Sequence, residues 1–218
     1  MTTTSLSYTR APALVILDMN QAVASTNSRF LSHLRAQGKD TSYFEDRVLR
    51  VVTPGINELA RSVRSVDGPV IWIRPEWRTA TAADWPDSYR QSIVESGFDA
   101  RSYEGLESFS LVDGFEVDDA DHFLSSFSVS AFWGSPLLST LRNLAVTDVL
   151  IVGCLTESAV VINALDSTNT GFLTTVVEDA CAGISRKRHV ESLSLHSRLF
   201  KVAMTADVIT KIARELQT

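Results

Sequence analysis

Long apolar runs, cysteines and basic residues are all scarce in this 218-residue chain, and each scarcity excludes a class of protein. No apolar run approaches the roughly 20 residues that span a bilayer, so no membrane segment is predicted. The two cysteines, Cys154 and Cys181, each follow an apolar run, which favours buried thiols over a disulfide framework or a zinc site. The net charge of −6 argues against nucleic acid or an anionic membrane as a partner.

What remains is the composition of an ordinary globular protein, with 44% hydrophobic and 21% charged residues. A chain of this length buries about 70% of its unfolded surface, so residues 1–218 are predicted to form a single domain. The first ten residues lack the apolar segment of a signal peptide, and a cytoplasmic location is therefore expected.

Short runs of continuously apolar residues predict strands that are covered on both faces, as in a parallel sheet. Four such runs and a weaker fifth are present, at residues 13–18, 69–75, 149–154, 174–180 and 201–205. Helical patterns alternate with them, which is typical of βαβ units with right-handed crossovers. The predicted fold is an α/β domain of three layers, α/β/α, with a mostly parallel central sheet.

Helix boundaries are marked by capping residues. Helices are predicted to begin at Thr53–Pro54 and at Ser135–Pro136, where an N-cap residue precedes a proline. Gly68 should lie beyond the end of the first, Gly171 should close a third helix, and a fourth should cover residues 185–200.

Two regions lie outside this pattern of alternating strands and helices. Residues 22–50 form a polar, helix-prone insertion, and residues 76–120 form a long aromatic-rich excursion that would serve as a lid or an interface.

Two charged residues stand at the carboxyl ends of predicted strands, where doubly wound sheets bind their ligands. Asp18 ends a wholly apolar strand, and a carboxylate there is costly to bury unless it has a partner or a function. We interpret Asp18 as functional, the alternative being a helix cap or a structural partner of Arg74. Arg74 could hold a substrate carboxylate with two hydrogen bonds or could neutralise Asp18, and both interpretations stay open.

The sequence gives weaker indications that a cysteine or serine side chain acts as a nucleophile. Cys154 is expected to pack in the interior, with a displaced nucleophile as the weaker alternative. No histidine is placed by the sequence to activate Ser126, Ser128 or Ser158.

The four histidines do not predict a metal site. His189 and His196 are seven residues apart on one predicted helix, without the third ligand that a metal would need. His33 and His122 stand in polar surroundings and are expected to be solvated.

Several blocks of the chain resemble the isochorismatase-like superfamily, also called the cysteine hydrolases. They are ALVILDMNQAV, GPVIWIRP, SAFWGSPLLSTLRNLAVTDVLIVG, Thr156 and VVEDACAGISRKRHVESL, and they follow the family's order over nearly the whole chain. The resemblance implies the α/β/α fold of that superfamily, a triad of Asp, Lys and Cys, and a homodimer or higher homo-oligomer.

Only one member of the implied triad is present. The Asp corresponds to Asp18, whereas the Lys position holds Ser126 and the Cys position holds Ala159. Without a thiolate no thioester can form, so covalent amide hydrolysis is not expected. Isochorismatases that cleave a vinyl ether also have a small residue at the Cys position, which Ala159 matches. They keep the Lys, and Arg74 could replace its charge but cannot shuttle a proton at neutral pH.

The resemblance does not extend to the metal site of the nicotinamidase branch. The Asp and two closely spaced His of that site are missing after WIRP, so neither zinc nor any other cofactor is expected.

Two functions from different classes remain open. The first is a hydrolase or lyase that acts on a small, carboxylate-bearing metabolite, with Asp18 as general acid/base, a raised pKa in a dry pocket, and Arg74 binding the carboxylate. The second is a catalytically impaired relative that keeps the pocket for binding or the surface for assembly. In both, the segment after Gly153 serves as pocket wall and oxyanion-type backbone. The residues predicted to line the pocket are Trp72, Trp77, Ser126, Phe127, Trp133, Cys154, Thr156, Ser158 and Ala159.

Overall fold

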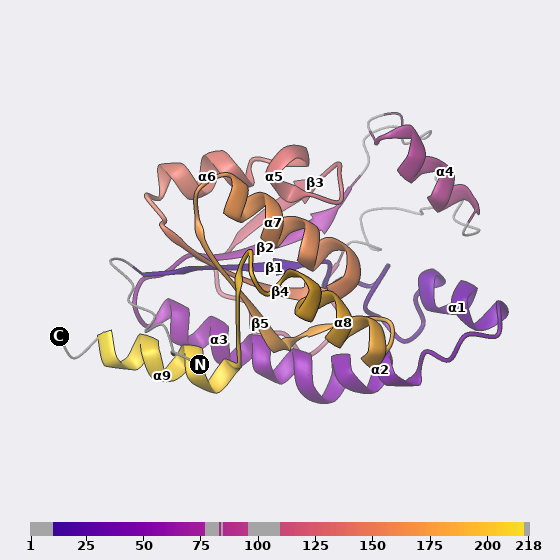
Figure 1. Ribbon diagram of the computed structural model, residues 1–218, viewed down its shortest axis with the longest axis horizontal. Coiled ribbons are helices and arrows are strands. Elements are labelled where there is room, and N and C mark those ends of the chain that lie inside the picture. Colours follow the sequence, from indigo (N-terminus) through magenta and orange to yellow (C-terminus); the bar gives the residue numbers. More distant parts are fainter. Residues whose placement is uncertain (1–10, 77–82, 84, 96–109, 216–218) are drawn as a thin grey trace.

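The computed structural model describes residues 11–76, 83, 85–95 and 110–215 (Figure 1). Its centre is a six-stranded sheet in the order β3-β2-β1-β4-β5-β6, in which every pair of neighbouring strands is parallel. The strands are β1 (Ala13–Leu17), β2 (Val70–Pro75), β3 (His122–Ser126), β4 (Asp148–Cys154), β5 (Leu173–Ala182) and β6 (Lys201–Ala203). The predicted parallel sheet is confirmed.

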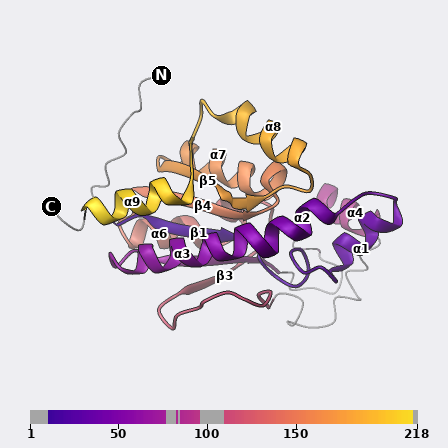
Figure 2. The same cartoon turned by 90° about the horizontal axis from the view of Figure 1, so that it is seen from below.

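Helices cover both faces of this sheet, which confirms the three-layer prediction. Figure 1 shows α3 and α9 below the strands and α5, α6 and α7 above them, and Figure 2 shows α3 and α9 from below. The α-helices are α1 (Arg29–Ala36), α2 (Ser42–Arg47), α3 (Thr53–Arg64), α4 (Asp87–Glu95), α5 (Ala131–Gly134), α6 (Leu137–Asn143), α7 (Val161–Asn169), α8 (Arg186–His196) and α9 (Thr205–Glu215). Two π-helical turns, η1 (Val48–Val52) and η4 (Thr156–Val160), join α2 to α3 and begin α7.

The segment α3 begins at Thr53 with Pro54 in its first turn, as predicted, but the predicted N-cap role of Thr53 is wrong. The chain is helical from Ser42 through η1 to Arg64, and the Thr53 region has no side-chain cap. Proline lacks the N–H that an α-helix interior needs, and the wider π-helical turn before Pro54 accommodates it. The predicted end is confirmed, because α3 stops at Arg64 and Gly68 lies beyond it.

Other predicted boundaries are confirmed. Ser135 Oγ accepts a hydrogen bond from Leu137 N at 3.1 Å, so this serine caps α6 as its sequence predicts. Gly171 has a φ of 100° just beyond α7, a conformation that ends helices and favours glycine.

β3 was not predicted, and its position explains why. It is an edge strand whose residues are mostly half-buried or exposed, so HFLSS lacks the continuous apolar run of the inner strands. His122, expected to be solvated, is half-buried in this strand. In contrast, every residue of β1 and of β4 is buried, and these two central strands form the middle of the core. The site described next lies at their carboxyl ends.

Candidate functional site

Asp18 follows β1 directly and lies between the carboxyl ends of β2 and β4. Its N–H donates to the Ile73 carbonyl at 3.1 Å, and its own carbonyl accepts from Cys154 Sγ at 3.4 Å. A Cβ on Gly153 would come within 2.1 Å of the Leu17 carbonyl oxygen, so only glycine lets β4 approach β1 this closely. The backbone around Asp18 is therefore held from both neighbouring strands.

The Asp18 carboxyl group has no compensating partner. Among the residues that the structure describes, none forms a hydrogen bond or an ion pair with it. Burial raises its pKa from 3.8 to about 7, because the ionised form loses hydration without gaining a counter-charge. A carboxyl group of this kind is protonated for part of the time at neutral pH and can donate that proton. The shift is in the direction that the general-acid hypothesis requires.

Arg74 does not form the ion pair with Asp18 that was left open as a structural interpretation. Leu17 and Ile73 are paired in register, which would place the next residue of each strand side by side. Asp18, however, leaves the strand with a φ of 55°, so its side chain no longer follows the strand's alternation. Within the described chain, Arg74 is half-buried and makes no salt bridge, which leaves carboxylate binding as its untested role.

Cys154 lies in the interior, as its packing interpretation expected. The residue is 0% exposed. Burial, and secondarily the negative charge of Asp18, raise the pKa of its thiol well above the usual value. The reactive species of cysteine is the thiolate, so this environment argues against the alternative of a displaced nucleophile.

Thr156, expected in the pocket, is instead part of a buried polar network. Its Oγ1 lies 2.8 Å from His189 Nδ1, and Arg47 Nη2 lies 3.1 Å from His189 Nε2. Because arginine only donates, Nε2 is the acceptor and Nδ1 carries the proton that bonds Thr156. Burial, followed by the Arg47 charge, lowers the pKa of His189 to about 4, so the imidazole is neutral. We define Arg47, His189 and Thr156 as the His189 network.

Arg47 also links the insertion 22–50 to the sheet through hydrogen bonds to β5. Arg47 Nε donates to the Cys181 carbonyl at 2.7 Å, and Nη2 donates to the Glu178 carbonyl at 2.9 Å. Sequence reasoning missed this residue, because nothing in the polar insertion distinguishes one arginine from the others. The His189 network therefore supports the start of η4 rather than presenting groups to a ligand.

The other residues at the positions of the implied triad also face protein groups. Ser126 is 3% exposed, and its Oγ donates to the Ser128 carbonyl at 2.7 Å. Ala159 is buried, and the half-buried Ser158 donates its N–H to the Leu155 carbonyl at 3.0 Å. Val160 N–H donates to the same carbonyl at 3.1 Å. The N–H groups of Ser158 and Val160 are thus bonded within the backbone.

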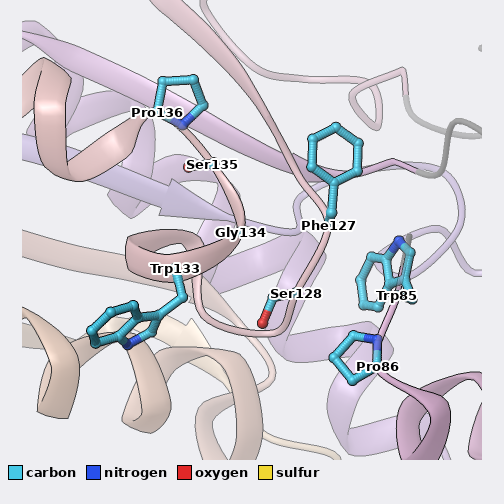
Figure 3. A pocket seen from close by; sticks show the side chains of 8 residues that line it. All are labelled: Trp85, Pro86, Phe127, Ser128, Trp133, Gly134, Ser135 and Pro136. Carbon is cyan, nitrogen blue, oxygen red and sulfur yellow. The ribbon is translucent and has the colours of Figure 1, made fainter. Parts of the chain in front are cut away.

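An open groove of about 700 Å³ lies beside the carboxyl end of β3 (Figure 3). Its lining contains no charged side chain and consists of Trp85, Pro86, Phe127, Ser128, Trp133, Gly134, Ser135 and Pro136. In Figure 3, Trp85 and Pro86 face the loop that carries Phe127, whereas the Trp133 ring projects from the other side of that loop. We refer to it as the aromatic groove. It contains Phe127 and Trp133, which the sequence assigned to the pocket of Asp18, but Asp18 is not among its lining residues. It also contains Trp85, which sequence reasoning missed.

Trp72 does not line the groove. It is 2% exposed, its ring packs edge-on against Phe115 at 5.2 Å between centroids, and its Nε1 donates to Asp121 Oδ2 at 2.8 Å. A tryptophan with an apolar body and a satisfied N–H is a core residue, so the expectation of a pocket wall is corrected. Trp77 lies outside the described residues.

The described residues contain no group of three or more His, Cys, Asp or Glu side chains arranged to hold a metal ion. No helix in the described part is long and apolar enough to cross a membrane. No step of the chemistry proposed below is routed through a metal.

Comparison with known proteins assigns the family. A sequence model of the isochorismatase domain matches residues 12–211. The chain belongs to the isochorismatase family. The predicted resemblance is thereby confirmed, and no curated protein matches the chain.

Solved structures of this family have the same fold. An isochorismatase family protein from Desulfovibrio vulgaris is 18% identical, covering 94% of this chain and 99% of its own, with a TM-score of 0.74. A cysteine hydrolase from Pseudomonas syringae is 16% identical, covering 94% and 93%, with a TM-score of 0.75. N-carbamoylsarcosine amidase from Thermoplasma acidophilum is 20% identical, covering 89% and 96%, with a TM-score of 0.65. At these identities the similarity to solved structures shows the fold alone.

Proposed function

We propose that this isochorismatase-family protein is an enzyme in which Asp18 acts as general acid/base and no covalent intermediate forms. The observation that supports it is the Asp18 carboxyl group, which lies at the carboxyl end of β1 without a described hydrogen-bond partner and has a pKa of about 7. A carboxyl group kept near half-protonation at neutral pH is suited to transferring a proton. Ala159 offers no nucleophile in its place.

The proposed reaction is the cleavage of a small, chemically labile metabolite such as a vinyl ether. Protonated Asp18 gives its proton to the vinyl carbon, and the resulting oxocarbenium carbon is attacked by water. The hemiketal formed then breaks its carbon–oxygen bond, and the proton released by water returns to the Asp18 carboxylate. General acid catalysis contributes about 10²- to 10⁴-fold, which is more adequate for a vinyl ether than for an amide.

The remaining groups are assigned to binding. Arg74 would hold a substrate carboxylate, since it is half-buried and makes no salt bridge within the described chain. Phe127 and Trp133 would form apolar walls, as they line the aromatic groove. A cytoplasmic location and a homo-oligomeric state belong to the same proposal.

The test is turnover of isochorismate, as the vinyl ether, and of nicotinamide, as the amide. We expect cleavage of the vinyl ether only, with a rate that falls as the pH rises through about 7, because Asp18 then loses its proton. Asp18→Asn should lower the rate by at least about 100-fold. Asp113→Asn, the same change at an exposed aspartate, is the matched control and should leave it unchanged. Full activity of Asp18→Asn would contradict the proposal.

A second function is metabolite binding without turnover. It is favoured because the hydroxyl and thiol groups near the site are bonded to protein groups or buried. Ser126 and Thr156 are bonded to protein groups, and Cys154 is buried. If the wild-type chain binds isochorismate in calorimetry but releases no product over hours, this second function is the correct one.

A further inference from the structure

One side of the aromatic groove is formed by a segment of the chain that is closed on itself. Residues 127–134 lead from β3 through α5, and Figure 3 shows the chain turning back between Phe127 and Gly134. Phe127 N–H donates to the Gly134 carbonyl at 2.8 Å, so the two ends of the segment are bonded to each other. We define residues 127–134 as the groove loop. Because its ends are joined, we expect the groove loop to move as one unit.

A single side chain of α7 holds the middle of the groove loop. Asn163 is 0% exposed. Its Oδ1 accepts from Ala131 N–H at 2.8 Å, and its Nδ2 donates to the Val129 carbonyl at 2.9 Å and to the Ala159 carbonyl at 2.8 Å. The amide oxygen and both amide hydrogens are therefore used. Two of the three bonds cross from α7 to the groove loop.

Asp166 makes a further bond between α7 and the same segment. Ser130 Oγ donates to Asp166 Oδ2 at 2.6 Å. Residues three apart on a helix lie on one face, so Asn163 and Asp166 present the same face of α7 to the groove loop. The groove loop is thus attached to α7 at Val129, Ser130 and Ala131.

The opposite side of the groove is anchored to a different element. Trp85 and Pro86 face the groove loop in Figure 3. Trp85 Nε1 donates to the Glu76 carbonyl at 2.7 Å, directly after β2. The width of the groove therefore depends on α7 holding one side and the end of β2 holding the other.

We infer that Asn163 is a positioning residue, which holds the groove loop against α7 and thereby sets the affinity of the aromatic groove for a planar, uncharged part of the ligand. This inference rests on the proposed function, in which Phe127 and Trp133 form apolar walls of the substrate site. Asn163 is buried, so it acts through the groove loop and does not touch the ligand. Its effect on affinity follows because a binding surface that is ordered before the ligand arrives lowers the ordering cost of binding.

The lining of the groove indicates the chemistry of that ligand part. Trp85, Phe127 and Trp133 supply aromatic surface, and no charged side chain is among the lining residues. Aromatic faces stack on planar rings, whereas an ionic group would lose hydration here without gaining a counter-charge.

Binding of indole, an uncharged planar probe, tests the inference. The full chain is labelled with 5-fluorotryptophan, and ¹⁹F NMR follows the Trp133 resonance, which Trp133→Phe assigns. We expect indole to shift this resonance in the wild type. Asn163→Leu keeps the branched shape of the side chain but has no hydrogen-bonding group. It should weaken indole binding by about 5-fold, the cost of ordering one further side chain on binding.

Ser167→Ala is the matched control on the same helix. Ser167 is also 0% exposed, and its Oγ accepts from Thr174 Oγ1 at 2.7 Å, a bond that links α7 to β5 rather than to the groove loop. This variant should be less stable to urea than the wild type but should bind indole equally well. If Asn163→Leu does not fold, Asp166→Ala makes the milder change, which removes only the bond to Ser130. It should weaken indole binding by less than about 5-fold.

Unchanged indole affinity in Asn163→Leu, or in Asp166→Ala if the first variant does not fold, would overturn the inference. An equal loss in Ser167→Ala would do the same, because Asn163 would then be only structural. So would a Trp133 resonance that indole does not shift in the wild type. None of these measurements requires turnover. A chain that loses indole affinity in Asn163→Leu but cleaves no isochorismate would support this inference while contradicting the proposed reaction.

Discussion

Asp18 and His189 are both titratable groups in the interior near the carboxyl end of β4, yet the protein treats them in opposite ways. His189 has a partner at each ring nitrogen, Thr156 at 2.8 Å and Arg47 at 3.1 Å, and is kept neutral. The Asp18 carboxyl group has no bonded partner among the described residues, and its pKa is about 7. A buried group whose bonds are all satisfied is structural, whereas an unpaired carboxyl group lowers stability when it ionises and is better explained by chemistry.

The same contrast distinguishes the two sides of the candidate site at the carboxyl ends of the central strands. On the side of β4 and η4, the polar groups support the backbone. On the side of β1 and β2, the side chains of Asp18 and Arg74 make no salt bridge within the described chain. Each prediction below tests whether this division holds.

The largest effect is expected from removing the cation of the His189 network. Arg47→Met leaves the Cys181 and Glu178 carbonyls and His189 Nε2 without their donor, which should lower the free energy of unfolding by about 3 kcal/mol. Arg74→Met is the matched control and should cost less than about 1 kcal/mol, because Arg74 makes no described salt bridge. Urea denaturation measures both, and equal losses would remove the distinction between the two sides.

The second effect is the pH dependence that His189 imposes. Its pKa is lowered from 6.5 to about 4 on folding, so its contribution is complete above pH 6.5 and is lost as the pH falls toward 4. The loss should reach about 3 kcal/mol by pH 4. The charged groups that face the ring are Arg47 and the Glu178 carboxylate at 4.0 Å. Urea denaturation of His189→Gln should show a weaker pH dependence in this window, and an unchanged one would contradict the assignment.

The third prediction has the opposite sign. The pKa of Asp18 is raised on folding, so its stabilising contribution is complete below pH 3.8 and is lost as the pH rises through about 7. Asp18→Asn should therefore increase the free energy of unfolding at pH 8 by about 2 kcal/mol, while it removes activity. At pH 4 the variant and the wild type should be equally stable. A variant that is less stable at pH 8 would indicate that Asp18 is structural.

The smallest effect concerns Cys154. Cys154→Ala should cost about 1 kcal/mol, as expected for a buried side chain that loses one contact atom. In the folded chain, labelling with a disulfide reagent should be slow at this thiol and unaffected by bound substrate, because the thiolate is strongly disfavoured. Rapid labelling that substrate suppresses would restore Cys154 as a nucleophile.

The inner part of the fold was predictable from the sequence because buried parallel strands require continuous apolar residues. β1, β2, β4 and β5 each coincide with such a run. The weak run at 201–205 contains β6, as predicted. The edge strand β3 and the helix α9 were not predicted, and HFLSS in β3 is mostly half-buried or exposed.

The site was predictable only where the signal is local. Asp18 stands out as a carboxylate that ends an apolar strand. Arg47 and His189, in contrast, are 142 residues apart in the chain, so their contact leaves no local signal in the sequence. The error over Trp72 has the same origin, because a tryptophan three residues before the end of its strand is equally consistent with a core or a pocket until its neighbours are known.

The central claim is that the half-buried Asp18 has no bonded partner in the described chain and is available as an acid. ¹³C NMR of aspartate-labelled protein, with Asp18→Asn to assign the resonance, follows the titration of this carboxyl group directly. We expect a midpoint near pH 7, in agreement with the effect of burial. A midpoint near pH 4 would show that the carboxylate is solvated or paired, and would contradict the claim.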